Sequence, residues 1–453
     1  MRALVVDPAG APSKPRRGFG RPGAAPSTLP AVEYRDIKTP HPQARGWVLV
    51  RPALAGICGQ DLALIKGEKT PSVLTAYSRR APVIPGHEVI GIVESAAHTR
   101  WVREGHRVLV EPTLRCAHKG LPDCPRCRVG ETHLCENADR AGALCSGRAL
   151  GSSQDTGGGW SEGFLVHEDM LVPADGIPDQ RGVLAEPAAT ALHAALRWHR
   201  SGDSAIVIGA GTLSRLIVAT LRRLHPDLDI TLVHEVQRGA RVKRRLLPAV
   251  VPSPAETPPA KVAGAARVWR GTPEELLLRT AELVGARLMR PAGDAPPVLD
   301  RGVDVVFDCR GSGQSLDLAI RLLRAGGTLV LAGQSGRHHV EWPLVWSREL
   351  TVCGSAAYGR EPSGHRTYAV IREWLTDPFF PIDNMVTHRF PLEEFDTALQ
   401  TAAAGTSVGA VKVVFEGPIA SLRRLSREAD EGAPSEAPVL LQATAARVRA
   451  EHV

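Results

Sequence analysis

Short apolar runs separated by turns dominate the first part of the chain. Three of them, WVLVRPALAG (47–56), HEVIGIVES (87–95) and HRVLVEP (106–112), have the length and the β-branched content of strands. A further run, FLVHED (164–169), follows a glycine-rich stretch at 157–163. Strands of this length, broken by turns, predict a small β-barrel.

From residue 184 onward, helices alternate with buried strands. Residues 184–200 and 213–224 have helical periodicity, and the apolar run AIVIGAG (205–211) lies between them. The later expected strands are ITLVHE, VDVVFDCRG, TLVLAG and LTVCGS, with the helix SLDLAIRLLRAG between the second and the third. This alternation predicts a doubly wound parallel sheet. After residue 365 the segments HRTYAVIREWL (a helix), VTHRFPLEEF and VKVVF close the globular part.

Three segments fall outside these elements. Residues 8–30 are rich in Pro, Gly and Arg, so we expect a long surface loop. Residues 248–264 (PAVVPSPAETPPAKVAG) are a Pro/Ala-rich insertion that we expect to be exposed. Residues 418–453 are expected to form a C-terminal tail.

Composition and charge limit the classes of function. The 453 residues are 43% hydrophobic and 23% charged, which is typical of a globular protein with two or three domains. No apolar run approaches the roughly 18 residues of a membrane-spanning helix. The first residues lack a basic start followed by a long apolar stretch, so we expect a cytoplasmic protein with no membrane partner. The net charge is +7, but the basic residues are scattered without interleaved aromatic residues, which argues against a nucleic-acid partner.

Three separate motifs supply a candidate catalytic metal site. Cys58 lies in GICGQD, His87 in PGHE and Glu186 in AEP. A thiolate, an imidazole and a carboxylate match the three-ligand set of a catalytic zinc, which keeps one position open for water or substrate. Asp61 and Glu88 are acidic neighbours that can orient the ligands. Each residue alone also fits a structural role, and it is their combination that favours a metal site.

A second group of cysteines falls within twenty positions. The group is Cys116, Cys124, Cys127 and Cys135. In a cytosolic chain such clustering favours metal over disulfides. Four thiolates with no open position describe a closed, structural zinc site in a lobe at 112–137. The alternative is a set of free thiols, and His118 can substitute for one cysteine as a ligand.

A glycine-rich turn between strand and helix, GAGTLS, is a candidate cofactor site. Gly209 permits the tight turn and Gly211 lets the backbone approach a pyrophosphate at the positive end of the helix. Ser214 stands where the motif has a third glycine.

The second strand of this region ends at an acidic residue. Glu235 can accept hydrogen bonds from both ribose hydroxyls, which favours NAD. Arg238 and Arg241 follow closely and can pair with a 2′-phosphate, so NADP stays open.

The ordered motifs resemble those of the zinc-dependent medium-chain alcohol dehydrogenases, in the branch with sorbitol, threonine and glucose dehydrogenases. The matching segments are GICGQDLAL, PGHEVIGIV, CPRCRVGETHLCEN, AEPAATALHA, VVFDCRGS, LRAGGTLVLAG and VTHRFPLEE. The resemblance implies an α/β fold with two parts, a GroES-like β-barrel catalytic domain and a Rossmann dinucleotide-binding domain. The implied division is 1–186 catalytic, 187–355 Rossmann, 356–417 a return to the catalytic domain and 418–453 the tail.

The resemblance also assigns roles to individual residues. It implies zinc ligation by the two groups above, with Glu88 near the catalytic metal, and a homo-oligomer that is a dimer or a tetramer. Next to the cofactor it places, besides the glycines, Thr212, Leu213, Cys309 and Arg310. The family's usual Ser or Thr two positions after the zinc cysteine is Gln60 here, an amide that does not readily relay a proton. Cys116 also stands farther from Cys124 than the family's two-residue gap, and Leu121 occupies the expected place.

The leading hypothesis is an enzyme that transfers a hydride between an alcohol and NAD(P). A secondary or polyol-type hydroxyl is favoured as the donor because of Glu186. The main alternative is a catalytically silent protein of the same fold that still binds zinc and dinucleotide. This alternative is suggested by Gln60 and Ser214, which depart from the family's residues. A zinc-binding nucleic-acid module is the least favoured, since it leaves most of the motifs unexplained.

Overall fold

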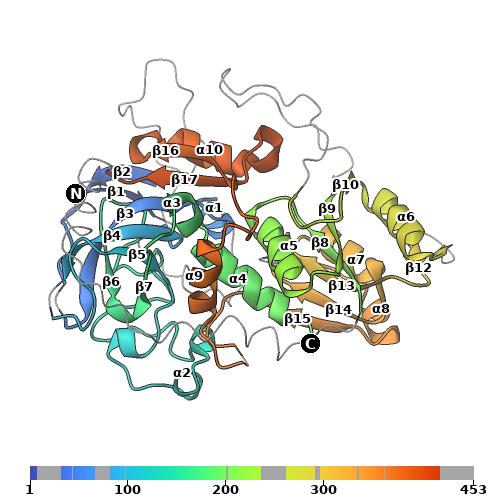
Figure 1. The fold of residues 1–453 in the computed structure, drawn as a ribbon, viewed down its shortest axis with the longest axis horizontal. Helices are drawn as coiled ribbons and strands as arrows, with labels where there is room; N and C mark the ends of the chain where they lie inside the picture. The colour runs from blue at the N-terminus through green and yellow to red at the C-terminus, as the bar shows by residue number, and fades with distance from the viewer. Residues whose placement is uncertain are drawn as a thin grey trace.

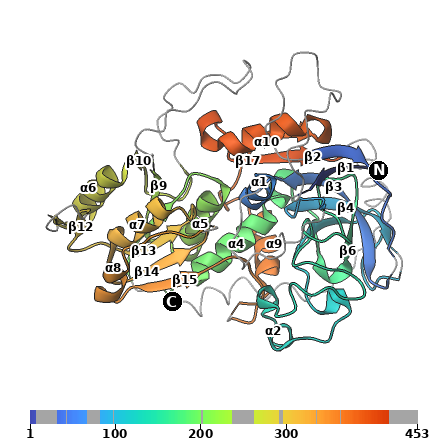
Figure 2. The same cartoon turned by 180° about the vertical axis from the view of Figure 1, so that it is seen from behind.

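The chain folds around two large sheets, with helices α4 and α9 between them (Figures 1 and 2). The computed structural model describes residues 1–7, 32–42, 44–66, 82–96, 98–199, 202–235, 262–290, 296–333, 336–361 and 363–418. The expected loop at 8–30 therefore lies outside the described residues, as do most of the insertion at 248–264 and nearly all of the tail. No helix in these ranges is long and apolar enough to cross a membrane.

The first sheet has seven strands in the order β16-β17-β3-β4-β5-β7, with β6 also paired to β3. Its strands are β3 (Trp47–Gly56), β4 (Val89–Ala96), β5 (Arg107–Val110), β6 (Phe164–His167), β7 (Leu171–Pro173), β16 (Val386–Pro391) and β17 (Lys412–Glu416). Register shifts between β3 and β4 bend it. No pairing among the described strands joins β16 to β7, so the expected barrel is here a curved, open sheet. A separate hairpin is formed by β1 (Arg2–Val6) and β2 (Val32–Asp36).

The second sheet is the predicted parallel sheet, in the order β10-β9-β8-β13-β14-β15. Its strands are β8 (Ser204–Ile208), β9 (Asp229–Glu235), β10 (Arg267–Gly271), β13 (Val303–Asp308), β14 (Leu323–Leu331) and β15 (Thr351–Gly354). The chain runs from β8 outward to β10 on one side of the sheet, and then from β13 outward to β15 on the other side. The strand order therefore reverses between β8 and β13, and the turn that follows β8 lies at this point. A crevice for a ligand is expected at such a switch point.

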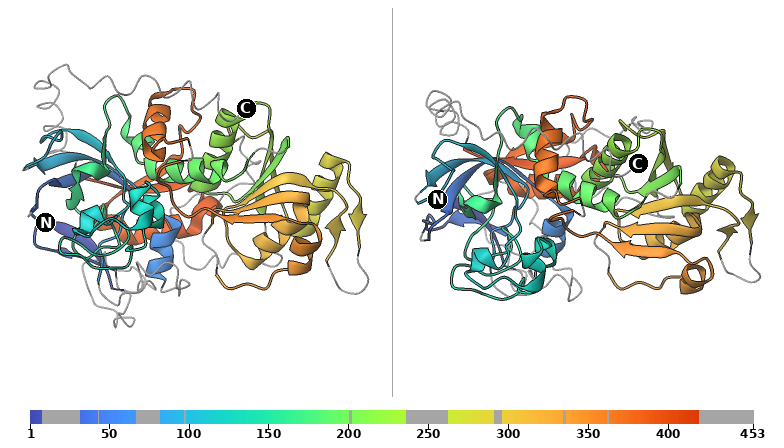
Figure 3. Two further views of the ribbon diagram at one scale, coloured as in Figure 1. Left: turned by 90° about the horizontal axis from the view of Figure 1, so that it is seen from below. Right: turned by 60° about the horizontal axis from the view of Figure 1, so that its bottom comes forward.

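Helices cover both faces of this parallel sheet, as a doubly wound fold requires (Figure 3). Along β8, Ala205 and Val207 belong to the core shared with α4 (Ala185–Leu196), α5 (Thr212–Leu224) and α9 (Thr367–Thr376). Ile206 and Ile208 point to the opposite core, shared with α6 (Pro273–Val284) and α7 (Gly313–Leu322). This alternation follows from the two-residue period of a strand.

The end of the chain returns to the first sheet. Helix α9 packs against α4, and β16 and β17 extend the sheet beside β3. The remaining helices and short strands are α1 (Gly59–Ile65), α2 (Pro125–Arg128), α3 (Asp179–Gly182), β11 (Leu288–Met289), β12 (Val298–Leu299), α8 (Trp342–Ser347) and α10 (Phe395–Ala404). The sequence analysis did not anticipate β10, α6, α8 or α10.

A carboxylate fastens the start of β8 to the start of β13. Asp304 accepts hydrogen bonds from the backbone N–H groups of Asp203 (2.9 Å) and Ser204 (2.9 Å). It also accepts from the Ser204 hydroxyl (2.6 Å) and from Nε of Arg324 (2.6 Å). Burial alone would raise the pKa of Asp304, but the Ser204 hydroxyl and Arg324 outweigh it and hold the pKa below its usual value.

We expect Asp304→Asn to lower the free energy of unfolding at neutral pH by about 1.5–3 kcal/mol, the range for hydrogen bonds to a charged group. A carboxyl group whose folded-state pKa is lowered stabilises the fold above its unfolded pKa, and this contribution disappears as pH falls through the folded pKa. Denaturant unfolding should therefore show a gap between wild type and variant that narrows from about pH 5 to pH 3. Asp227→Asn, at an exposed carboxylate, is the control. A gap that does not change with pH would contradict this role.

Candidate active site and cysteine lobe

Cys58 lies at the start of α1, immediately after β3. The Cys58 thiol accepts a hydrogen bond from the backbone N–H of Gln60 (3.2 Å), and the Asp61 carboxylate accepts one from the backbone N–H of Cys58 (3.0 Å). Together they form a capping box that fixes the turn. Gly56 lets Glu88 approach, because a Cβ at this position would lie 1.9 Å from Oε2 of Glu88.

His87 follows Gly86, a position that only glycine readily occupies. Gly86 has a φ of +97°, and a Cβ there would lie 2.5 Å from the side chain of Trp160. The Nδ1 atom of His87 is 3.6 Å from Oδ1 of Asp61. Since the ring is held from its Nδ1 side, Nε2 is the nitrogen available to a metal. Asp61, which is 1% exposed, thus contacts both His87 and the backbone of Cys58.

Glu186 enters the site from the first turn of α4. Its Oε1 accepts a hydrogen bond from the Thr190 hydroxyl (3.3 Å), one helical turn later. Burial raises the pKa of Glu186 to about 7, against the opposing influence of His87. A cation bound beside this carboxyl group would oppose the effect of burial and favour its ionised form.

Glu88 is engaged by a buried lysine from β17. Nζ of Lys412 donates to Oε1 of Glu88 (2.7 Å) and to the carbonyl oxygen of Ile57 (3.2 Å), and it also contacts Oε2. Both side chains of the pair are only 3% exposed. The expected acidic neighbour of the metal is therefore neutralised inside the protein, and Lys412 is a site residue that the sequence analysis missed.

These elements bring a small group of donors together. Ligand atoms of Cys58, His87 and Glu88 lie within 4.8 Å of one another. Glu186 lies outside this close group, although it interacts electrostatically with His87. Burial raises the pKa of the Cys58 thiol to about 11, with a further contribution from Asp61. A thiol with such a pKa ionises beside a cation, and sulfur, nitrogen and carboxylate donors fit zinc.

The four cysteines of the second group converge as well. Their sulfur atoms lie within 4.8 Å of one another, and all four residues are buried. The sulfur atoms of Cys116 and Cys135 are 3.6 Å apart, and Cys124 accepts from the backbone N–H of Cys127 (3.4 Å). The four cysteines are free thiols. A closed set of four sulfur donors fits a structural zinc.

Two polar side chains support this cluster. The Nδ2 group of Asn137 donates to the sulfur of Cys116 (3.3 Å). Lys119 is fully buried and donates to the carbonyl oxygens of Asn137 (2.7 Å) and Ala138 (2.6 Å). A buried positive charge beside four thiolates lowers the cost of concentrating negative charge there. The sequence analysis missed both residues.

His118 does not replace a cysteine in the cluster. Its Nδ1 atom accepts a hydrogen bond from the backbone N–H of Arg115 (3.3 Å), and its ring centroid is 5.2 Å from that of His167. The longer stretch between Cys116 and Cys124 still delivers the Cys116 thiol to the other three.

The glycine-rich turn has the backbone geometry of a dinucleotide loop. Gly209 has a φ of +146°, and a Cβ there would lie 3.2 Å from the Cβ atoms of Cys309 and Ser214. A Cβ at Gly211 would meet nothing within 4 Å, so its backbone is open to a ligand. Ser214 is buried, and its hydroxyl donates to the carbonyl oxygen of Gly211 (2.9 Å). Serine is therefore accommodated in place of the third glycine.

The other residues expected at the cofactor lie at two places, the start of α5 and the end of β13. The Thr212 hydroxyl donates to the carbonyl oxygen of Val411 (2.7 Å), and Leu213 packs against the core. Cys309 adjoins Gly209 at the end of β13, and the backbone N–H of Arg310 donates to Asp308 (2.9 Å).

The side chains expected at the ribose lie outside the described part of the structure. Glu235 ends β9, as predicted, but only its backbone is described. Arg238 lies outside the described residues. Their roles toward NAD or NADP stay predictions.

Two protein-family models match separate stretches of the chain. Residues 44–179 match the alcohol dehydrogenase GroES-like domain, and residues 252–375 match the zinc-binding dehydrogenase domain. The chain belongs to the zinc-dependent medium-chain alcohol dehydrogenase family. Membership in this family makes it an oxidoreductase that acts on CH–OH groups, with zinc and NAD(P) as cofactors.

Individual members of the family show the extent of the similarity. L-threonine 3-dehydrogenase of Deinococcus deserti is 24% identical over 378 residues, which cover 82% of this chain and 92% of that protein. L-galactonate-5-dehydrogenase of Escherichia coli is 26% identical over 346 residues, which cover 76% and 84%. The crystal structure of 2R,3R-butanediol dehydrogenase from Bacillus subtilis has a TM-score of 0.61 at 23% identity and covers 85% and 96%. This last likeness confirms the fold of the dehydrogenase.

Proposed function

We propose that this dehydrogenase oxidises a secondary or polyol-type hydroxyl at a zinc ion held by Cys58, His87 and Glu186. The observation that carries the proposal is the meeting of a thiol and an imidazole near the carboxyl group in the first turn of α4, with Asp61 bound to the backbone of Cys58 and facing Nδ1 of His87. The names L-threonine 3-dehydrogenase and L-galactonate-5-dehydrogenase refer to internal carbons and support a secondary hydroxyl as the donor.

The residues around the metal divide the chemical work. When bound, zinc polarises the substrate oxygen and makes its proton easier to remove. Asp61 orients His87 through Nδ1 and holds the turn that carries Cys58. Lys412 keeps the Glu88 carboxylate paired, so that Glu88 adds little net charge. Because Gln60 does not readily relay a proton, we propose that a water held by Glu186 or Glu88 takes the proton that leaves the substrate oxygen.

For the cofactor we propose NAD, bound at the turn between β8 and α5. The open backbone at Gly211 suits the pyrophosphate, and Glu235 at the end of β9 suits the ribose hydroxyls. We expect Glu235→Ala to raise KM for NAD by about tenfold, the value of one lost charged hydrogen bond. KM for NADP should rise less or fall, since the carboxylate repels a 2′-phosphate. Steady-state kinetics with both cofactors measures this, with Glu274→Ala as an exposed control, and equal losses for both would transfer the choice to Arg238 or Arg241.

The domain division and assembly are also proposals. We propose a catalytic domain at 1–186 and 356–417 that is interrupted by a dinucleotide-binding domain at 187–355. We also propose a cytoplasmic protein that assembles as a dimer or a tetramer. The exposed Trp342 (61%) and Trp346 (83%) of α8, near the edge strand β15, support assembly of some kind. Light scattering of the purified protein measures the assembly.

The proposed function is tested by assaying NAD and NADP reduction with polyols, sugar acids, hydroxy amino acids and primary alcohols, together with zinc analysis. We expect turnover of at least one secondary alcohol by a protein with two zinc ions per chain. Two bound zinc ions and bound dinucleotide without oxidation of any alcohol would instead favour the catalytically silent alternative. Oxidation of primary alcohols only would refute the substrate class.

A further inference from the structure

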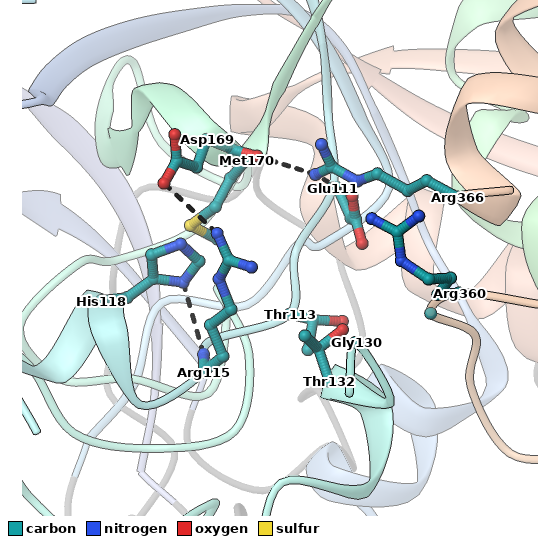
Figure 4. Close-up of a pocket in the computed structure, with 11 residues that line it drawn as sticks. Glu111, Thr113, Arg115, His118, Gly130, Thr132, Asp169, Met170, Arg360 and Arg366 are labelled. Carbon is teal, nitrogen blue, oxygen red and sulfur yellow. Dashed lines mark hydrogen bonds and ion pairs between the residues drawn. The ribbon is translucent and has the colours of Figure 1, made fainter. Parts of the chain in front are cut away.

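A polar pocket lies between the cysteine lobe, the first sheet and the loop before α9, and none of its lining residues belongs to the candidate catalytic site. Its volume is about 460 Å³ when the open solvent at its mouth is included. Figure 4 shows Arg115 and His118 on one side, and Arg360 and Arg366 on the other. Thr113 and Thr132 lie between these two sides, and their hydroxyl groups are hydrogen-bond donors.

The carboxylates of the pocket are already paired with arginines. Glu111 forms an ion pair with Arg366 through Oε2, although this oxygen has no hydrogen bond of normal geometry among the described residues. Oδ2 of Asp169 is 3.2 Å from Nη2 of Arg115, and its Oδ1 contacts Arg100. Arg360 at the open side donates to a backbone carbonyl and adds a further positive charge. The three arginines of the lining thus outnumber its two carboxylates, and the pocket carries a net positive charge.

Two buried donors of the pocket have no hydrogen-bond partner among the described residues. They are Nε of Arg115 and Nε2 of His118, and His118 is only 2% exposed. Because Nδ1 of His118 accepts from the backbone N–H of Arg115, the neutral ring carries its proton on Nε2. Donors that are buried without a partner cost free energy, and an acceptor that enters the pocket removes this cost.

A metal ion does not suit this pocket. Ligand atoms of His118, His167 and Asp169 lie within 4.8 Å of one another. However, Nδ1 of His167 already accepts from the backbone N–H of Asp169 (3.2 Å). Both carboxylate oxygens of Asp169 face arginines, which repel a cation.

We propose that the pocket binds a small tetrahedral oxyanion, either inorganic phosphate or the phosphate group of a metabolite. Arginine forks and hydroxyl donors match the geometry of phosphate oxygens. His118 lies within the stretch between Cys116 and Cys124 that is longer than in the family, so this departure supplies part of the site. A bound anion links the cysteine lobe to the loop before α9, and it thereby stabilises the lobe.

The test uses the full-length protein with its zinc, at constant ionic strength, titrated with inorganic phosphate or sulfate against chloride. We expect a saturable rise of about 2–4 °C in the midpoint of thermal unfolding, together with heat of binding in calorimetry. Glucose 6-phosphate and glucose are the second pair of probes, and they separate a phosphoester from free phosphate as the ligand. The proposal is supported if phosphate, sulfate or glucose 6-phosphate raises the midpoint while chloride and glucose do not.

Two variants and one control locate the binding. Arg115→Met should abolish the rise, and Arg360→Met, at an exposed residue whose loss the fold tolerates, should weaken it at least about tenfold in affinity. Arg126→Met removes an exposed arginine of the same lobe, paired with Glu131, and should leave the response unchanged. The proposal is overturned if none of the three oxyanions shifts the wild type more than chloride and glucose do, or if Arg126→Met and Arg360→Met respond alike. A third zinc ion per chain that is lost in His118→Phe would equally overturn it.

Discussion

Cys58→Ser should reduce turnover by at least about 10³-fold while the protein keeps its fold, because a serine hydroxyl does not replace the thiolate that holds the catalytic zinc. The zinc content should fall from two ions per chain to one. The midpoint of thermal unfolding should change little, since the capping interactions of α1 involve the backbone and Asp61 as well as the sulfur.

A matched control is available for this variant. Cys353 is also half-buried but lies on β15, outside both groups of donors. Cys353→Ser should keep full activity and both zinc ions. If Cys58→Ser retains both zinc ions and its activity, then Cys58 is a packing thiol and the catalytic site lies elsewhere.

Cys127→Ser should have the opposite profile, with a large effect on stability. A structural zinc contributes directly to the free energy of folding, so we expect a loss of at least about 3 kcal/mol and one zinc ion fewer. Calorimetry and metal analysis on the same sample measure both quantities. Cys145→Ser is the control variant. Cys145 is buried beside the lobe, where its thiol donates to the carbonyl oxygen of His118 (3.3 Å), and it is not one of the four cysteines of the cluster. A wild type with one zinc ion or none would contradict the assignment of the cysteine cluster.

Much of the architecture was predictable because the relevant patterns are local. The apolar runs of β8, β13 and β14 and the periodicity of α4 and α5 indicate their own structure, and alternation implies a parallel sheet. Helix α6 was missed although Thr272 and Glu275 form a capping box at its start. This signal is local and is contained in the sequence TPEE, so the start of α6 is recognisable without the structure.

The curvature of the first sheet and the pairing of Glu88 could not be predicted, because both depend on contacts between distant segments of the chain. Whether a set of strands closes depends on pairings between distant segments, and a period-two pattern contains no information about them. Lys412 is one lysine among apolar residues in a strand, and nothing local shows that its partner is 324 positions earlier. The free donors of Arg115 and His118 likewise become apparent only when neighbours in space are known.

The Lys412–Glu88 pair has a consequence for the order in which the protein is made. The ribosome delivers Glu88 long before Lys412, and a carboxylate without its lysine is costly to bury. The site around Cys58 and His87 is therefore incomplete until β17 has emerged and paired with β3. All strands of the parallel sheet precede residue 355, although α9 later completes the core on one of its faces. We infer that the catalytic metal is loaded only after β17 has emerged, whereas the cysteine lobe contains all four of its ligands within twenty residues and can capture its zinc much earlier.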